Sequence, residues 1–248
     1  MITIKSQKEI LIMQEGGKIL AKVLKEIKNL AKPGIATIDL DRACEALILK
    51  YGATPSFKGY HSFPHSICIS INEEVVHCLP SSRILKEGDV VCLDLGVFYK
   101  GYHTDMAETI AIGKTSFEAK RLIMVARKAL KRGIKKTKIG NTIGDIGNTV
   151  QRYVEGQGFS VIRDLCGHGI GKNIHEDPAI PNFGKRGDGQ KLSEGMVICI
   201  EPMATAGSWQ IKKTKDGYGF SSKDNSITAH FEHTIAITKH GPKILTEL

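Results

Sequence analysis

The sequence predicts an α/β protein that forms a single domain over residues 1–248, and three observations favour this fold class. Amphipathic stretches with helix-start signals occur in both halves of the chain. Short segments rich in β-branched and apolar residues follow them, as expected for strands. The order helix, glycine turn, Thr-Ile and helix occurs twice, around 34–38 and around 140–143, which suggests two similar halves.

Four helices are predicted from their end signals. Ser6 and Glu9 form a capping box, in which side chain and backbone satisfy each other's free donors at a helix start. Thr115 and Glu118 offer a second capping box at the start of the third helix. We therefore expect a first helix that ends at Pro33-Gly34, a second over 38–50, a third that begins at Thr115 and carries 120–138, and a fourth over 143–155.

Five strand-like segments lie between and after these helices. They are rich in Val, Ile and Thr, which suit a pleated and largely buried surface. The expected strands are 67–71, 90–99, 109–112, 196–201 and 234–238.

Composition indicates a soluble globular protein in a reducing compartment. The apolar fraction is 41% and the charged fraction 25%, and no run of about 20 apolar residues predicts a membrane span. The N-terminal stretch MITIKSQKEILIMQ is too charged for a secretory signal. The six cysteines contain no CxxC pair, so we expect them to be reduced core residues and the protein to be cytoplasmic. We also expect a monomer.

The net charge of +9 is concentrated on the third predicted helix, where residues 120–138 contain nine Lys or Arg and no Asp or Glu. Ile123, Ala126, Leu130 and Ile134 recur at helical spacing, so the outer face of this helix is basic. A solvated helix face is the favoured interpretation, because no aromatic or RNA-binding motif accompanies the charge. The alternative is a docking surface for a polyanion such as ribosomal RNA.

Four acidic residues occupy places that otherwise predict buried or strand structure. Asp94 interrupts the apolar run 90–95, and Asp105 follows a turn-like Tyr-Lys-Gly; Glu201 ends the apolar run 196–200, and Glu232 opens a strand. A buried carboxylate is costly unless it is paired or bound to a cation. Any one of them alone would suggest a salt bridge to Lys or Arg. Four without a basic residue in the same strands favour a metal site.

His168 joins these acids within the glycine-rich stretch 166–171, where the glycines let the backbone crowd a site. Four carboxylates and two divalent cations balance in charge, so we expect two metal ions. Oxygen-rich ligation with one imidazole suits Mn²⁺, Fe²⁺ or Co²⁺ better than a structural zinc site. Paired ions of this kind activate a water and polarise a carbonyl.

Two further histidines, His77 and His175, lie near these segments and could donate hydrogen bonds to a substrate carbonyl or its oxyanion. A lone histidine is more often structural. The remaining six are interpreted as structural or surface residues: His61, His65, His103, His230, His233 and His240.

Taken together, these stretches resemble the type I methionine aminopeptidases of the pita-bread fold, over nearly the whole chain. The matching motifs are CISINEEVVH (68–77), DLGVFYKGYHTD (94–105), CGHGIGKNIHEDP (166–178), IEPM (200–203) and FEHTI (231–235). The resemblance implies a curved, mostly antiparallel sheet in two pseudo-symmetric halves covered by helices. The spacing between the matching motifs leaves no room for the helical insertion of type II members, so a short bacterial-type enzyme is expected.

The resemblance also implies a role for each matching residue. Asp94, Asp105 and Glu232 would hold one metal ion, and Asp105, His168, Glu201 and Glu232 the other, with Co, Mn, Fe or Zn as candidates. Glu201 would also move the proton of the bridging water. His175 would contact the scissile carbonyl, and His77 the substrate backbone and the tetrahedral intermediate. The substrate would be the N-terminal methionine of nascent polypeptides with a small second residue.

Several positions depart from the family pattern. Cys78 and Thr104 stand where glycine is usual, and Phe231 replaces tyrosine. The methionine pocket is expected at Tyr60, Phe63, Cys68 and Tyr218, the last in place of a common tryptophan. Such a pocket suits a thioether. Cys78 and Thr104 are expected to narrow it or to shift the metal ions.

Two other functions remain open from the sequence. An Xaa-Pro aminopeptidase would keep the metal ions and change the pocket. A non-catalytic pita-bread protein would dock on RNA or the ribosome through the basic face at 120–138 and would be expected to have lost ligands, whereas none is lost here.

Overall fold

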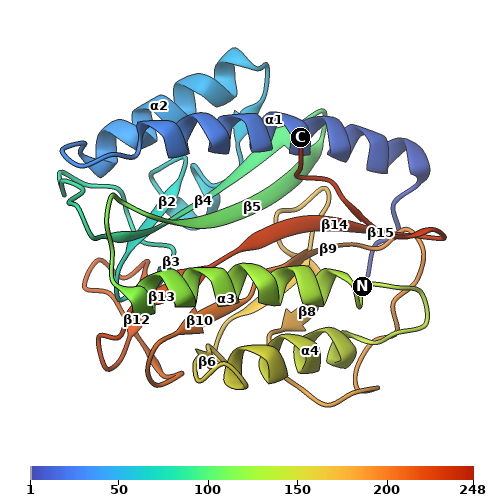
Figure 1. Cartoon of the computed structure of the whole chain (residues 1–248). Helices are drawn as coiled ribbons and strands as arrows, with labels where there is room; N and C mark the ends of the chain where they lie inside the picture. The colour runs from blue at the N-terminus through green and yellow to red at the C-terminus, as the bar shows by residue number, and fades with distance from the viewer. Residues whose placement is uncertain (1) are drawn as a thin grey trace.

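The computed structural model describes residues 2–248 as four α-helices around a curved antiparallel sheet. The helices are α1 (Gln7–Leu30), α2 (Thr37–Lys50), α3 (Phe117–Ile134) and α4 (Ile143–Glu155). In Figure 1, α1 and α2 lie at the top of the view and α3 and α4 at the bottom, with the strands between the two pairs. The predicted α/β class and its two similar halves are confirmed.

The nine-stranded main sheet joins the two halves. Its order is β1 (Thr54–Pro55), β4 (Val90–Tyr99), β5 (Tyr102–Ala111), β14 (Glu232–Thr238), β9 (Val197–Ile200), β7 (Cys166–Gly169) and β8 (Glu176–Pro181), with β2 (Cys68–Ile71) beside β4 and β15 (Gly241–Ile244) beside β14. The contact between β5 and β14 is the seam between the halves.

Two three-stranded sheets complete the strands. One is β13 (Thr228–His230), β10 (Met203–Thr205) and β6 (Ser160–Val161), and the other is β11 (Ile211–Lys213), β12 (Phe220–Ser222) and β3 (Glu74–Val76). A short 3-10 helix, η1 (Tyr60–Ser62), lies in the connection between β1 and β2. Among the described residues, no helix is both long and apolar enough to cross a membrane.

Each half has its own apolar core between helices and sheet. Leu20 and Leu24 of α1 pack with Leu93 and Leu95 of β4 in the first core. In the second core, α3 and α4 pack on the strands through residues such as Val125, Leu130, Ile146, Ile198 and Ile200. The helices thus cover one face of the sheet in each half, and the other face is left for polar side chains.

The helix ends agree with the sequence in part. The Ser6–Glu9 capping box is confirmed, and Thr142 and Asp145 form another at α4. The capping box expected at Thr115 is wrong: Ser116 caps α3, while the Thr115 hydroxyl donates to the Gly88 carbonyl. The first helix ends at Leu30, before the expected Pro33-Gly34.

The strand at 90–99 is confirmed, but the one expected at 109–112 is longer and begins at Tyr102. The Tyr-Lys-Gly turn is tight, with Lys100 and Gly101 both at positive φ, so pairing resumes at once. Asp105 therefore lies inside a strand.

Candidate metal centre

All five predicted ligands line one pocket of about 200 Å³ between the two halves: Asp94, Asp105, His168, Glu201 and Glu232. The pocket also brings in His77 and His175, as well as Tyr60, Phe63, Cys68 and Tyr218. Every predicted ligand, both accessory histidines and the four predicted pocket residues thus line one cavity.

The β4–β5 hairpin holds two of the acids in the middle of a regular ladder. Asp94 is paired with Ala107, and Gly96 with Asp105, so the two carboxylates lie two residues apart on the same face. The backbone of Asp105 is fixed further by Thr234 of β14, whose hydroxyl donates to the Asp105 carbonyl at 2.8 Å and accepts from its N–H at 2.9 Å.

Glu232 extends this row of acids across the seam. Ala107 is the cross-strand partner of both Asp94 and Glu232, so the three residues share a line across β4, β5 and β14. Side chains at such positions point to one face of the sheet. Glu201 follows the last residue of β9 and enters the same pocket from the next strand.

His168 lies in β7 at a register shift between Gly167 and Gly169. Both glycines are needed for space, because a Cβ at Gly167 would lie 2.3 Å from the Cys199 carbonyl oxygen and one at Gly169 would lie 2.1 Å from that of Asp177. The His168 Nδ1–H donates to the Gly169 carbonyl at 2.8 Å. This bond leaves the lone pair of Nε2 for a cation.

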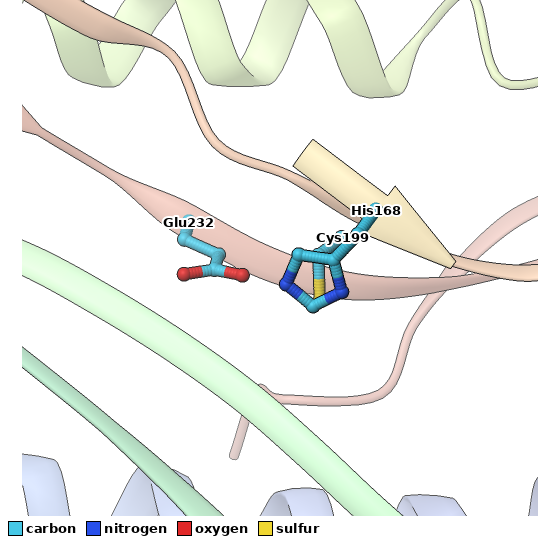
Figure 2. A group of neighbouring side chains, drawn as sticks. All are labelled: His168, Cys199 and Glu232. Carbon is cyan, nitrogen blue, oxygen red and sulfur yellow. The ribbon is translucent and has the colours of Figure 1, made fainter. Parts of the chain in front are cut away.

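The ring of His168 and the carboxylate of Glu232 face each other in Figure 2, with the Cys199 thiol beside them. Ligand atoms of these three residues lie within 4.8 Å of one another, as do those of Asp94, Asp105 and Glu232. His168 Nε2 is 3.6 Å from Glu201 Oε1. The arrangement could hold more than one metal ion.

The electrostatics of the pocket favour a cation. Burial raises the pKa of Asp94 to about 7, and burial together with neighbouring carboxylates raises the pKa values of Asp105 and Glu232 well above their usual range. The pKa of Glu201 is also raised well above its usual range, mainly by burial and then by the negative charges of Asp105 and Asp94. Burial also lowers the pKa of His168 to about 3, so the ring is neutral.

Buried oxygen atoms without partners support the same conclusion. Asp94 Oδ1 and Glu232 Oε1 have no hydrogen-bond partner within residues 2–248, and none of the four acids forms an ion pair with Lys or Arg there. The salt-bridge explanation for the acids is therefore wrong. Unpartnered buried carboxylates with an imidazole are a donor set that fits divalent cations.

His77 and His175 stand beside the acids as neutral imidazoles. Burial lowers the pKa of His77 to about 4 and lowers that of His175 as well. The backbone of His77 is in the left-handed region at φ 59°, a strained conformation that often marks a functional position. His175 Nδ1 is 2.9 Å from the Tyr60 hydroxyl, and its ring centroid lies 4.4 Å from that of His168.

Aromatic side chains form the apolar wall of the pocket. Phe63 packs edge-on against Phe57 and Tyr218 at centroid distances of 6.4 and 5.8 Å. The Tyr218 hydroxyl donates to the Ser62 carbonyl at 3.0 Å. Phe57, Ile174 and His61 also line the pocket, and sequence reasoning did not place them there. A signal for His61 was its position next to Tyr60.

Neither Cys78 nor Thr104 narrows this pocket, and neither belongs to its lining. The Cys78 thiol points away to the carbonyls of Val76 and Phe220, at 3.5 and 3.8 Å. Thr104 lies on the opposite face of β5 from Asp105 and faces Gly16 of α1. The expectation that they constrict the site is wrong, because strand alternation and a local turn direct both side chains elsewhere.

His230, interpreted from sequence as structural, is buried at the site. Its Nε2 is 3.6 Å from Glu201 Oε2 and 3.8 Å from Glu232 Oε2. Its place two residues before Glu232 was a signal that could have found it.

The N-terminal segment 3–5 contacts the loop that carries His175. Lys5 Nζ is 2.7 Å from Glu176 Oε2, both side chains are almost fully buried, and the Thr3 hydroxyl donates to the same carboxylate. The Lys5 N–H donates to the Gly195 carbonyl at 2.8 Å, so the segment also reaches the turn before β9.

Comparison with known proteins places this geometry in a family. The profile of metallopeptidase family M24 matches residues 12–239. A methionine aminopeptidase from Clostridium perfringens is 48% identical over 246 residues, which is 99% of either chain. The chain belongs to metallopeptidase family M24. Within it, the chain groups with the methionine aminopeptidases.

Solved structures of M24 proteins agree with the fold. The crystal structure of the Thermotoga maritima methionine aminopeptidase matches with a TM-score of 0.98 and 42% identity over the full length of both chains. A prolidase from Pyrococcus horikoshii matches with a TM-score of 0.81 and 26% identity, and this chain spans 63% of it. The pita-bread fold of M24 is thereby confirmed. Family membership also implies divalent metal use, which the clustered acids and histidines could support.

Proposed function

We propose that this chain hydrolyses the peptide bond after an N-terminal methionine and prefers a small second residue. One observation carries the proposal: the ligand cluster and the apolar wall of Tyr60, Phe63, Cys68 and Tyr218 share a single pocket. The unbranched thioether of methionine fits an aromatic wall of this kind. The methionine aminopeptidases similar over the full chain support the same activity.

The pocket would hold two divalent ions. Asp94, Asp105 and Glu232 would bind one, and Asp105, His168, Glu201 and Glu232 the other, so Asp105 and Glu232 would bridge. Four carboxylates neutralise two divalent charges, and Co, Mn, Fe or Zn are the candidates. When bound, such ions polarise a carbonyl and lower the pKa of water.

The remaining steps fall to side chains of the pocket. Glu201 lies at the end of β9 facing the cavity and would hold the proton taken from the attacking water. His175 would donate a hydrogen bond to the scissile carbonyl, oriented by the Tyr60 hydroxyl at 2.9 Å. His77 would contact the substrate backbone and the developing oxyanion.

A peptide panel tests this function. Metal-loaded protein is incubated with Met-Ala-Ser, Met-Lys-Ser and Ala-Pro-Ser, and free amino acids are measured. We expect release of methionine from the first peptide and little from the second, because a small second residue is required. No release from Met-Ala-Ser contradicts the proposal. Release of alanine from Ala-Pro-Ser alone would establish the Xaa-Pro alternative, which the likeness to a prolidase over part of that chain's length motivates.

We also propose that the chain docks on the ribosome, near emerging nascent chains, through the basic face of α3. The lining of a surface cleft between α3 and α4 includes Arg132, Lys136, Arg152, Tyr153 and Arg186. Among the described residues, no Asp or Glu lines this cleft. Such a cleft would attract phosphate groups. Cosedimentation with ribosomes should weaken steeply with salt and with the double variant Arg132→Glu, Arg152→Glu. Unchanged cosedimentation of that variant contradicts docking.

A cytoplasmic, monomeric single domain over residues 1–248 completes the proposal. The two apolar cores meet through the shared sheet, which supports one cooperative unit. Light scattering during gel filtration should give a mass near 27.1 kDa. A dimer mass, or two separate unfolding transitions, would contradict it.

A further inference from the structure

The pocket contains a buried histidine that the proposed chemistry does not use. His230 is 1% exposed, and its Nε2 has no hydrogen-bond partner within residues 2–248. The two polar groups nearest to it are carboxylate oxygens of different ligands, Glu201 at 3.6 Å and Glu232 at 3.8 Å. A buried polar atom aimed between two such ligands needs a physical account.

The position of His230 is set from three strands. In β13 it pairs with Met203 of β10. Thr109 of β5 fixes its backbone on both sides, because the threonine hydroxyl donates to the His230 carbonyl at 2.7 Å and accepts from its N–H at 2.9 Å. Cys92 of β4, the cross-strand partner of Thr109, places its Sγ 3.7 Å from His230 Nδ1.

The surroundings of the ring decide where its proton lies. A bare Nε2 would direct a lone pair at two carboxylates, whereas an Nε2–H donates toward them. With the proton on Nε2, Nδ1 becomes an acceptor. The Cys92 Sγ lies 3.7 Å from Nδ1 and 3.8 Å from the His230 carbonyl, so the single thiol proton can be donated to either of them. The Cys92 thiol, the His230 ring and the two glutamate carboxylates thus lie in one row from β4 to the candidate metal ligands, and the 3.6 and 3.8 Å separations at Nε2 are longer than a hydrogen bond.

We propose that His230 is a positioning residue that orients Glu201 and Glu232 by the attraction of its Nε2–H to their carboxylates across 3.6 and 3.8 Å, with its tautomer set by Cys92. Partners of this kind orient ligating carboxylates, and their loss typically lowers metal affinity or activity about 10- to 100-fold. The proposal rests on the proposed metal site. It assigns His230 a role beside the ligands and not among them.

Two amide variants test whether a donor is needed at the position of Nε2 or whether any polar side chain suffices. The amide nitrogen of glutamine can occupy the place of Nε2, while that of asparagine reaches only the place of Nδ1. His230→Gln should therefore keep the dissociation constant for Mn²⁺ within about threefold of wild type, and His230→Asn should raise it about 10- to 100-fold. Cys92→Ala should raise it about fivefold, as expected for one lost hydrogen bond, and Cys92→Ser should restore it.

The measurement is calorimetric titration of metal-free protein with Mn²⁺, followed by kcat and KM on Met-Ala-Ser. His233→Gln is the matched control, since His233 is the next histidine in sequence and contacts Thr246 at 2.9 Å instead of the ligands. Its Mn²⁺ affinity should equal wild type. We expect His230→Asn to lower kcat with KM nearly unchanged.

Equal Mn²⁺ affinity of His230→Asn and wild type overturns the proposal, as does equal weakening by the glutamine and asparagine variants at unchanged melting temperature. Wild-type protein that takes up no Mn²⁺ would instead sink the proposed metal site. The two failures are therefore distinguishable.

Discussion

The two halves of the molecule contribute to the centre in different ways. The N-terminal half supplies Asp94 and Asp105 from inside the ten-residue strands of one regular hairpin, each held by neighbours along the ladder. The C-terminal half supplies its candidate ligands from strand ends and irregularities: Glu201 after β9, Glu232 at the start of β14, and His168 at a register shift in β7. Regular pairing fixes the first pair, and local packing must fix the other three.

Removing one of the two acids proposed to bridge, one from each half, is the strongest test of this contrast. Asp105→Ala and Glu232→Ala should each lower kcat/KM on Met-Ala-Ser at least about 1000-fold, because metal ions supply several kcal/mol of transition-state stabilisation. Metal uptake should fall in both.

Glu108→Gln provides the control for these variants. Glu108 lies in the same strand and pairs with Lys28 at 2.6 Å, away from the pocket. Its activity should remain within about twofold of wild type, as expected for a surface pair. Retained activity in Asp105→Ala would show that the hairpin does not supply a bridging ligand.

Glycine substitutions compare how the two halves tolerate crowding. Gly169→Ala should cost about 3 kcal/mol, because the new Cβ meets the backbone carbonyl of Asp177 at 2.1 Å. Gly96→Ala in the hairpin meets Ser56 Cβ at 2.8 Å and Phe57 Cε1 at 2.9 Å; the Phe57 ring can turn, whereas Ser56 Cβ moves only with its backbone, so about 2 kcal/mol is expected. Urea unfolding of the metal-free proteins measures both. Equal costs would remove the contrast between strand interior and strand end.

The apolar wall offers a smaller effect that leaves both ligand sets untouched. Tyr218→Ala removes the ring packed on Phe63 and should lower kcat/KM for Met-Ala-Ser about 10-fold, as for a lost apolar contact in a specificity pocket. Tyr218→Phe keeps the ring and loses only the bond to Ser62, so a change below about threefold is expected. A loss in the phenylalanine variant as large as in the alanine variant would assign the effect to the hydroxyl.

The smallest expected effects come from the two capping boxes, which occur at helix starts, one in each half. Hydrogen bonds from the Tyr102 hydroxyl and, to a smaller extent, from Ser6 lower the pKa of Glu9 to about 2. A hydrogen bond from the Thr142 N–H likewise lowers the pKa of Asp145. A lowered pKa in the folded state adds stability above the unfolded pKa of about 4.5 for Glu, and this stability is lost as pH falls toward 2.

Both acids are partly exposed, so solvent screens them, and Glu9→Gln and Asp145→Asn should each cost about 0.5–1 kcal/mol at pH 7. The difference from wild type should vanish near pH 2 for Glu9. Thermal melts at both pH values measure it, and a cost that persists in acid would assign the effect to the amide geometry.

The fold and the residues that gather in the pocket could largely be read from sequence because both depend on local pattern. The run 90–99 has strand composition, and Asp94 within it is anomalous without any knowledge of its neighbours. Ser6 and Glu9 specify a helix start within four residues. Such local signals can be recognised in the sequence without knowledge of the fold.

The parts that could not be predicted depend on direction and on distant partners. Cys78 and Thr104 lie beside site residues in sequence, but the turn at His77 and the alternation of β5 direct their side chains away. His230 looked like an ordinary core residue, because its neighbours Cys92 and Thr109 lie more than 100 residues earlier in the chain. Sequence proximity is a weak guide to which side of a strand a group faces.

The contact of segment 3–5 with Glu176 has a practical consequence. The carboxylate held by Thr3 and Lys5 belongs to the residue directly after His175, so the start of the chain is joined to the loop that carries a side chain of the pocket. A purification tag fused before residue 1 would add atoms beside this contact, whereas one placed after Leu248 would leave its surroundings unchanged. Kinetic constants measured with the two tag positions should therefore differ, and the C-terminal tag is the better choice.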